Sequence, residues 1–265
     1  MPSGRPDEDI GLGPADTYPG PGFLAPRERC AYLADRSARL EVNQLAHISP
    51  EEYDLLLSRG WRRMGSAVFR ARCEGCQECI PIRIPISGFR RSKSQRRVWN
   101  RNADVELRIA EPSLDPARLE LYDAFHRERA RSRGWPENTP DPLEYLHTFV
   151  LNAARTLEFS YWLGPRLVGV AIVGESQAAL NSIYAYFDPQ LHRRSLGTFD
   201  VLSEIEEAAR RGKDFLYLGY YVEGCISMRY KAGFRPHELR TRGAWAPPSP
   251  AGPETPPGAP RDHST

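Results

Sequence analysis

A short loop, HRRSLGT at residues 192–198, contains the residue types that bind a phosphate. Gly197 lets a ligand approach the backbone closely, and the first N–H groups of a following helix, around Thr198, lack intrahelical partners. Arg193 and Arg194 add positive charge beside them, with Ser195 next in the loop. The pattern favours an anion site, although a capped surface helix with solvated arginines would show the same letters.

The most basic window of the chain is FRRSKSQRRVWNRN, residues 89–102. None of its residues is acidic, and the next acid along the chain is Asp104. Like charges at helical spacing repel one another. A partner of opposite charge is therefore favoured over a solvated face: either RNA phosphates or a carboxylate held by arginine forks. Trp99 is expected to anchor the segment in the core. The cations are Arg90, Arg91, Lys93, Arg96, Arg97 and Arg101.

Three cysteines, Cys73, Cys76 and Cys79, follow a C-x-x-C-x-x-C pattern. Thiolates at this spacing can converge on one ion, with Cys30 as a fourth ligand of a structural zinc or an iron–sulfur cluster. A set of reduced thiols is the alternative, because no second C-x-x-C pair follows. Cys225 stands alone and is expected to be a small buried residue.

The loop at 192–198 is framed by regular elements. A strand over 183–187 ends at Asp188-Pro189, an amphipathic helix follows over about 199–211, and FLYLGYY at 215–221 is a second strand. Because ligands bind where neighbouring strands end and diverge, Asp188 and Tyr220 are candidates for a reacting cleft. SMRYKA, residues 227–232, predicts a closing helix before Gly233.

The rest of the chain predicts further elements in order. A helix begins at Ser49-Pro50 and stops at Gly60, and IPIRIPI at 80–86 predicts an edge or bulged strand because of its prolines. Helices over 115–134 and 143–151 precede three strands joined by short turns, most simply an antiparallel meander. These strands are expected at 158–163, 166–176 and 179–187.

Composition limits the class of protein. The chain has 265 residues, 40% of them hydrophobic, and a net charge of +2, which suits two moderate cores. Neither an apolar run of membrane length nor a signal segment occurs, so a cytoplasmic protein without a membrane partner is expected. Pro- and Gly-rich residues 1–27 and 242–265 predict disordered tails, and the joint near Pro112 divides residues 28–111 from 112–241.

The order of strand, RRSLGT loop, helix, strand, helix and Gly233-Phe234 resembles the acyl-transfer half of GCN5-related acetyltransferases. Their loop holds a cofactor pyrophosphate, and Ser195 stands where they have a first glycine. The resemblance implies an α/β (α+β) fold: an acetyltransferase-like C-terminal domain with a mixed, largely antiparallel sheet, after a smaller α/β N-terminal domain that carries the cysteine cluster.

Longer strings resemble the aminoacyl-tRNA–protein transferases of the N-end rule, over about residues 29–239. The resemblance implies transfer of an aminoacyl group, leucine in compact bacterial members and arginine in longer eukaryotic ones, from aminoacyl-tRNA to proteins beginning with Asp or Glu, which marks them for degradation. The strings are CAYLADRSARL, FRARCEGCQECIPIRIPI, FRRSKSQRRVWNRN, SIYAYFDP, RRSLGTF and YLGYYVEGCISMRYKAGFRP.

Under this resemblance the residues take roles as hypotheses. The loop from Arg193 to Thr198 holds the tRNA 3′ end, the arginines of 90–97 bind the acceptor's acidic side chain or the tRNA backbone, and Asp188 and Tyr220 face the amine. No cofactor is required for the chemistry. A coenzyme A-dependent N-acetyltransferase and a non-enzymatic metal-knuckle RNA-binding protein remain the alternatives.

Overall fold

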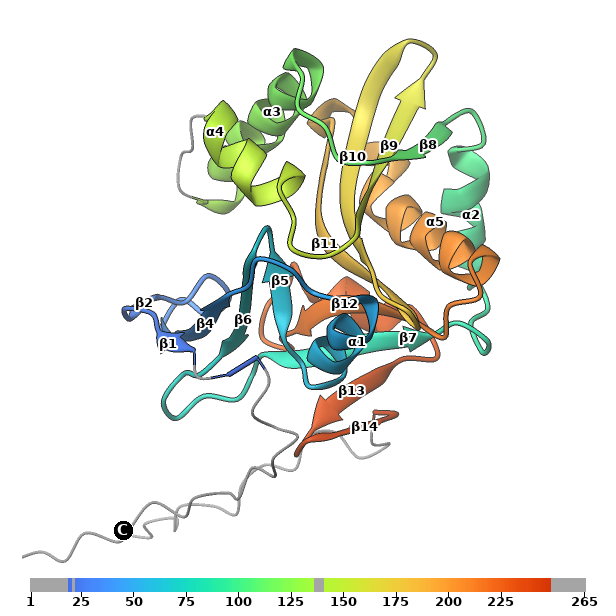
Figure 1. Ribbon diagram of the computed structural model, residues 1–265. Helices are drawn as coiled ribbons and strands as arrows, with labels where there is room; N and C mark the ends of the chain where they lie inside the picture. The colour runs from blue at the N-terminus through green and yellow to red at the C-terminus, as the bar shows by residue number, and fades with distance from the viewer. Residues whose placement is uncertain (1–18, 21, 136–140, 249–265) are drawn as a thin grey trace, which may run out of the picture.

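A mixed sheet of eight strands is the largest feature of the computed structural model, which describes residues 19–20, 22–135 and 141–248 (Figure 1). Its strand order is β14-β13-β7-β12-β11-β10-β9-β8, so both halves of the chain contribute to it. The strands are β7 Ile80–Pro85, β8 Glu106–Ala110, β9 Thr156–Leu163, β10 Arg166–Glu175, β11 Ala179–Phe187, β12 Phe215–Tyr221, β13 Glu238–Thr241 and β14 Ala244–Ala246.

The predicted meander is confirmed. β9, β10 and β11 pair antiparallel in succession, and helix α5, Leu196–Arg210, then crosses over to β12, which pairs parallel with β11. α5 begins three residues before the expected position, because the loop residues Leu196 and Gly197 already belong to its first turn. The chain is thus a mixed α/β protein with a largely antiparallel sheet.

Helices cover the two faces of this sheet (Figure 1). On one face, α5 and α2, Lys93–Arg101, pack over Ala171, Val173 and other apolar side chains. On the other face, α3, Pro116–Arg133, and α4, Pro142–Tyr145, pack over Val170 and Ile172, which alternate with the first pair along β10. A π-helical turn, Leu146–Val150, extends α4, so the predicted helix at 143–151 is present with a widened second half.

A smaller sheet in the order β1-β4-β6-β5 lies at the lower left in Figure 1, beside the β12 and β7 part of the main sheet. Helix α1, Pro50–Ser58, packs its buried Tyr53, Leu56 and Leu57 there, and Ser49 and Glu52 form the capping box at its start. The predicted helix at Ser49 is therefore confirmed. The small strands are β1 Phe23–Leu24, β4 Leu40–Gln44, β5 Arg62–Met64 and β6 Ala67–Ala71, with β2 Glu28–Arg29 and β3 Ser37–Ala38 as a separate pair.

Two predicted elements are wrong in part. β7 is an interior strand between β12 and β13, and not an edge; its prolines are tolerated because β13 pairs only with Ile82 and Arg83. The segment 227–232 does not form an α-helix but a short 3-10 turn, Arg229–Gly233, in which each bond spans three residues, as from Lys231 N–H to the Met228 carbonyl.

The large sheet extends across residue 111, where the sequence suggests a boundary. β7 and β8 precede that residue and pair with β12 and β9, which follow it. β1 and β14 lie inside the ranges predicted as tails, most of which fall outside the described residues. Within the described part of the chain, no helix combines the length and apolar character needed to cross a membrane.

Candidate functional site

A cavity of about 360 Å³ lies between α3 and the segment that connects β11 to α5. Three of the residues predicted from sequence line it: Asp188, Ser195 and Gly197. The opposite wall comes from α3 and includes Arg129 and Arg133. The loop singled out by its glycine and arginines therefore borders a space that can hold a ligand.

The turn before α5 has an unusual backbone. A 3-10 turn, Pro189–Arg194, ends at Ser195, which adopts the left-handed conformation with φ of 56° and no side-chain cap. Few residues other than glycine take this conformation. The N–H of Thr198 donates to the Ser195 carbonyl at 2.9 Å, so the expectation of a free N–H at Thr198 is wrong; the helix starts earlier.

The carbonyls of Arg193 and Arg194 contact the end of α2, and neither residue lines the cavity. The Arg101 guanidinium donates to the Arg193 carbonyl at 2.5 Å, and the Asn102 amide donates to the Arg194 carbonyl at 2.9 Å. The Arg194 guanidinium forms a forked pair with Asp104 at 2.7 and 2.9 Å, and this hydrogen bonding lowers the pKa of Asp104. These contacts fix the position of the turn.

The positive charge in the cavity comes from α3. Arg129 lies over the ring of Phe125 at 4.8 Å from its centroid, and Arg133 follows one turn later. Burial lowers the pKa of Arg129, and the charge of Arg133 lowers it further. Because like charges at this spacing repel, an anion bound between the two side chains would reduce their mutual repulsion.

Asp188 and Tyr220 do not face a common space. Asp188 is 6% exposed, accepts from the Gln190 N–H at 2.9 Å, and forms an ion pair with Arg166 at the cavity. The Tyr220 hydroxyl instead accepts from the Ala71 N–H of β6 at 3.1 Å. Burial raises the pKa of this tyrosine, which therefore stays protonated.

β11 and β12 separate after a short parallel ladder. Pairing covers only Ala179–Asn181 of β11 and Phe215–Tyr217 of β12. The next residues of β11 contain a bulge, because Ser182 and Tyr184 pair with consecutive residues of β10 and Ile183 is the extra residue. Backbone groups that leave a ladder in this way become available to other partners.

The Arg62 side chain of β5 lies where β11 and β12 separate. Its guanidinium donates to the Asn181 side-chain oxygen at 3.1 Å and to the Ser182 carbonyl at 3.2 Å. Gly219 of β12 has a φ of +77°, and a Cβ on it would lie 2.5 Å from the Arg62 Cζ. The glycine is therefore required for this close approach.

Two carboxyl groups on α5 are buried against the sheet. Asp200 accepts from the Tyr161 hydroxyl at 2.7 Å, whereas neither oxygen of Glu204 has a hydrogen-bond partner of good geometry among the described residues. Burial raises the pKa of both groups; Asp200 raises that of Glu204 further, and Ser182 and Arg62 only partly oppose this. Glu204 is thus held mainly in the neutral form.

Lys231 is buried nearby, in the 3-10 turn after β12. Its ammonium group donates to the Tyr220 carbonyl at 2.7 Å. Burial lowers the pKa of Lys231 to about 7, and the charge of Arg62 contributes to the shift. Arg62 therefore remains the fully charged group at this place.

The basic window forms the exposed surface of α2. Arg90, Arg96 and Arg97 are exposed, while Arg91 pairs with Glu206 at 2.6 Å and lies 3.6 Å above the ring of Trp99. Trp99 packs on Phe199 with centroids 5.3 Å apart, which confirms it as a core anchor.

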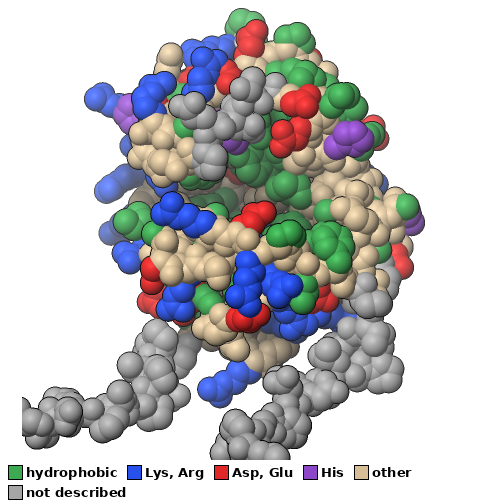
Figure 2. Space-filling view, turned by 90° about the vertical axis from the view of Figure 1, so that its left-hand side faces the viewer, with side chains coloured by type: hydrophobic (Ala, Val, Ile, Leu, Met, Phe, Trp, Pro, Cys, Tyr) green, Lys and Arg blue, Asp and Glu red, His purple; other side chains and the backbone are tan. Residues whose placement is uncertain are grey.

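A second cavity, about 180 Å³, lies between Met64 of β5 and a group of aromatic side chains. Figure 2 shows the surface hollowed between the part that holds α3 and α4 and the part that holds the small sheet, with hydrophobic side chains inside. The aromatic residues of the cavity are Tyr122, Tyr145, Phe149 and Tyr184, with Asp141 and Glu144 beside them.

The predicted metal site is not confirmed. Cys30, Cys73, Cys76 and Cys79 are near enough that the other three add to the effect of burial and raise the pKa of Cys79 to about 12. Within the described ranges, however, no group of three or more His, Cys, Asp or Glu is arranged to hold an ion, and the four are free thiols.

Several residues at these places were not singled out from the sequence. Arg129 and Arg133 belong to a helix with charges all along it, and nothing local marks which of them face a cavity. Arg62 has no signal at all, because its neighbours lie more than a hundred positions away. Only the i,i+4 spacing of Asp200 and Glu204, beside apolar residues, hints that they share a buried face.

The sequence matches two family profiles. Residues 28–97 match "Arginine-tRNA-protein transferase, N terminus", and residues 117–241 match "Arginine-tRNA-protein transferase, C terminus". An aspartate/glutamate leucyltransferase of Marinobacter nauticus is 38% identical over 227 residues, covering 84% of this chain and 94% of the relative. One of Campylobacter jejuni is 33% identical over 221 residues, covering 82% and 92%.

Similarity to solved structures is weak. FemX gives a TM-score of 0.41 at 9% identity over 64% of this chain and 59% of FemX. L-PGS from Bacillus licheniformis gives 0.39 at 11% identity over 68% and 52%. The sequence matches span both halves of the chain and nearly the whole length of the relatives, and they show that this chain belongs to the arginine-tRNA-protein transferase family.

Proposed function

We propose that this chain transfers a leucyl group from aminoacyl-tRNA to the N-terminal amine of proteins that begin with Asp or Glu, and so marks them for N-end rule degradation. The observation that carries the proposal is the match over both halves of the chain to relatives named aspartate/glutamate leucyltransferase, at 38% identity for one of them. As a family member, the chain is an aminoacyltransferase. Arginine is the second candidate for the transferred residue, because the family profiles are named for arginine.

The reaction makes modest chemical demands. The aminoacyl ester is already activated, and an N-terminal amine with a pKa of about 7.7–8.0 is substantially neutral at cellular pH. The enzyme mainly has to align the amine with the ester carbonyl and stabilise the oxyanion that forms. No step requires a covalent intermediate on the protein or a cofactor.

The tRNA 3′ end is assigned to the cavity of about 360 Å³. Arg129 and Arg133 pair with its phosphates from one wall, and the first turn of α5 at Gly197 faces them from the other with its helix N-terminus. Arg193, Arg194 and Thr198 act indirectly, since they hold the turn in place. The ester then extends along β11 toward the place where β12 diverges.

The exposed arginines of α2 are assigned to the tRNA backbone. Arg90, Arg96 and Arg97 present charge to solvent, whereas recognition of an acidic side chain requires a desolvated cation near the amine. Arg91 is held by Glu206 and Trp99 and supports the surface.

The acyl-transfer half is proposed to be of the GCN5-related acetyltransferase type. The antiparallel meander, the crossover by α5 and the parallel pair that separates after three residues support this. Asp188 is proposed to order the cavity wall through Arg166, near the ester. Tyr220 is proposed to position Lys231 through its carbonyl and strand β6 through its hydroxyl.

The test uses the full-length chain with Leu-tRNA or Arg-tRNA, each carrying a radiolabelled amino acid, and peptides that begin with Asp, Glu or Gly. Label from Leu-tRNA is expected on the Asp and Glu peptides only. Thermal stabilisation by acetyl-CoA, with acetyl transfer to peptide, would establish an acetyltransferase instead. Salt-dependent tRNA binding without any transfer would establish a binding protein and overturn the proposal.

A further inference from the structure

Arg62 differs from Arg118 and Arg83, two other enclosed arginines, in how its charge is balanced. Arg118 pairs with the buried Glu158, and Arg83 pairs with Glu238 at 2.7 Å. The Arg62 guanidinium donates to two neutral oxygens, those of Asn181 and Ser182. Among the described residues no carboxylate lies within ion-pair distance of its guanidinium.

The neighbouring residue, Arg63, shows what a purely structural arginine looks like here. Arg63 is 1% exposed and donates to the Gly65 carbonyl, the Asn152 side chain and the Thr156 hydroxyl, at 2.9, 2.6 and 2.6 Å. Its two terminal nitrogens donate to neutral acceptors, and its Nε is buried without a hydrogen-bond partner among the described residues. Arg62 is only half-buried, so part of its guanidinium is accessible.

The surroundings hold the Arg62 side chain in one position. Asn181 is fully buried and donates to the Tyr53 hydroxyl of α1 at 2.8 Å while its oxygen accepts from Arg62. Gly219 leaves room for the guanidinium between the separating strands. A fixed guanidinium loses little further freedom on binding a ligand, which favours tight recognition.

The charges nearby leave this place electropositive. Glu204 is the nearest buried acid without a partner, and it is held mainly neutral by burial and by Asp200. Lys231 adds a partial charge of the same sign as Arg62. A group with a negative charge would therefore be bound at this point.

We propose that Arg62 binds the side-chain carboxylate of the aspartate or glutamate at the acceptor's N-terminus. This assignment rests on the proposed function, and it names the residue that selects the acceptor. Arg62 and Met64 share one face of β5, and Met64 lines the cavity of about 180 Å³, which gives the peptide a route to the guanidinium. Because the site lies where β11 and β12 diverge, the bound residue presents its amine near the path assigned to the ester.

The consequence is selectivity between a carboxylate and its neutral amide. An arginine that loses its intended partner inside a partly desolvated site leaves a charge unpaired, and such sites reject isosteres strongly. The enzyme is therefore expected to prefer peptides beginning with Asp over peptides beginning with Asn by roughly 100-fold or more in kcat/KM.

The experiment compares full-length wild type, Arg62→Met and Arg62→Lys with Leu-tRNA and peptides that differ only in their first residue: Asp, Glu, Asn or Gln. Arg62→Met should lower kcat/KM for the acidic peptides roughly 100-fold and leave the amide peptides nearly unchanged. The Asp:Asn ratio should then fall below about 10. The KM for Leu-tRNA should stay within about twofold, because Arg62 is remote from the tRNA cavity.

Arg108→Met is the matched control, since Arg108 is exposed on the edge strand β8 and pairs with Glu106 at 2.8 Å. It should keep the full Asp:Asn ratio. The ratio of kcat/KM for the Asp peptide to that for the Asn peptide does not depend on the folded fraction of the enzyme. If Arg62→Met fails to fold, the same ratio measured for Arg62→Lys decides. A variant of Arg62 that still prefers Asp as wild type does would overturn this assignment alone. Absence of transfer by wild type to every peptide would overturn the proposed function, and this assignment with it.

Discussion

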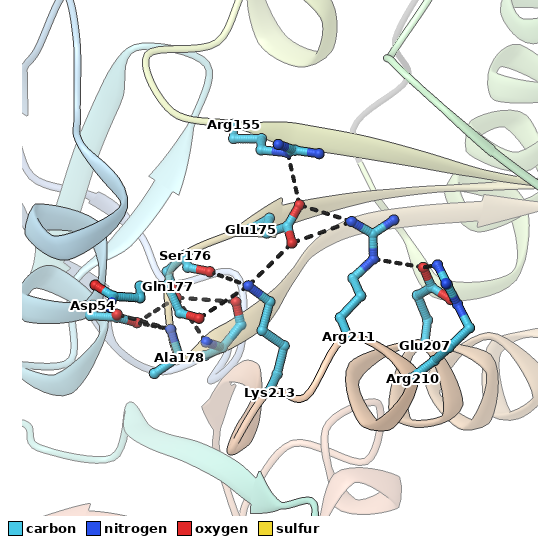
Figure 3. Close-up of polar contacts among 11 residues, drawn as sticks. Asp54, Arg155, Glu175, Ser176, Gln177, Ala178, Glu207, Arg210, Arg211 and Lys213 are labelled. Carbon is cyan, nitrogen blue, oxygen red and sulfur yellow. Dashed lines mark hydrogen bonds and ion pairs between the residues drawn. The ribbon is translucent and has the colours of Figure 1, made fainter.

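The acidic side chains in the two halves of α5 differ in whether they are paired with cations. In the C-terminal half, Glu207 accepts from Arg210 and Arg211 at 2.6 Å each, and Arg211 continues to Glu175 (Figure 3). In the N-terminal half, Asp200 and Glu204 are enclosed, and among the described residues no cation reaches ion-pair distance of either. One helix thus joins a region of paired charges to one of unpaired charges.

The paired region connects elements that are distant in sequence. Glu175 receives Arg155, Arg211 and Lys213, and Lys213 also donates to the Ser176 and Gln177 carbonyls (Figure 3). Asp54 of α1 accepts from the Ala178 N–H at 3.0 Å and so ties the same turn to the small sheet. Such a network stabilises the fold, whereas unpaired charge costs stability and persists where a ligand uses it.

The largest effect is expected from breaking the paired region. Glu175→Gln removes the charge that three cations share, in a side chain only 11% exposed, and should cost about 3 kcal/mol of unfolding free energy. Burial alone would raise the pKa of Glu175, but Lys213, Arg211 and Arg155 outweigh it and lower the value. The loss should therefore be constant above pH ~4.5 and vanish as the pH falls through the folded pKa.

Urea unfolding at pH 7 measures this loss. Glu106→Gln, which breaks the exposed pair with Arg108, is the control and should leave the midpoint almost unchanged. An equal effect of both substitutions would show that the region in Figure 3 is no more than a set of surface pairs.

Local pattern predicted much of the architecture. The meander and the alternation of β11, α5 and β12 follow from periodicity and turn residues that act over a few positions. The interior place of β7 does not, because it depends on β13 pairing with only Ile82 and Arg83 from the far end of the chain. Acids near the start of a helix commonly compensate its dipole, yet Asp200 near the start of α5 faces Tyr161 inside the core.

The next effect tests the cavity assigned to the tRNA 3′ end. Arg129→Ala with Arg133→Ala should lower kcat/KM for Leu-tRNA roughly 30-fold, because two phosphate contacts are lost. The dependence of tRNA binding on salt should also become shallower, by about 1–2 in the slope of log K against log salt. Stability should change little, since neither arginine forms an ion pair with the residues that the structure describes.

The control lies on the same helix. Arg127→Ala with Arg131→Ala removes the same charge at the same spacing, but neither of these arginines lines the cavity; Arg127 pairs with Asp123, and Arg131 pairs with Glu128. Equal losses for both double variants would show that only the overall charge of α3 matters, and the assignment of the cavity would fail.

The candidate site was predictable from sequence only where its residues lie close together along the chain. The loop before α5 was identified because glycine and arginine stand beside a helix start, and it does border the cavity. The role predicted for Arg193 and Arg194 stays a prediction: neither residue lines the cavity, whereas Arg129, about sixty positions earlier, does. Contacts over such distances depend on how helices pack on the sheet, and single-sequence periodicity does not specify this packing.

The smallest expected effect concerns Glu204 in the N-terminal half of α5. Its substitution should raise the unfolding free energy, whereas Glu175→Gln should lower it. Glutamate in the unfolded chain titrates near pH ~4.3, whereas burial and Asp200 raise the folded pKa of Glu204 well above its ordinary value. As the pH rises from about 4.3, the unfolded chain releases a proton that the folded chain keeps, so this group makes wild type less stable.

Glu204→Gln removes the titration while leaving a similar neutral polar group, and should be more stable than wild type by about 1 kcal/mol at pH 7. Urea unfolding from pH 4 to pH 8 should show the difference growing from near zero as the pH rises. A variant less stable than wild type at pH 7 would mean that Glu204 is charged and paired, and the contrast between the two halves of α5 would disappear.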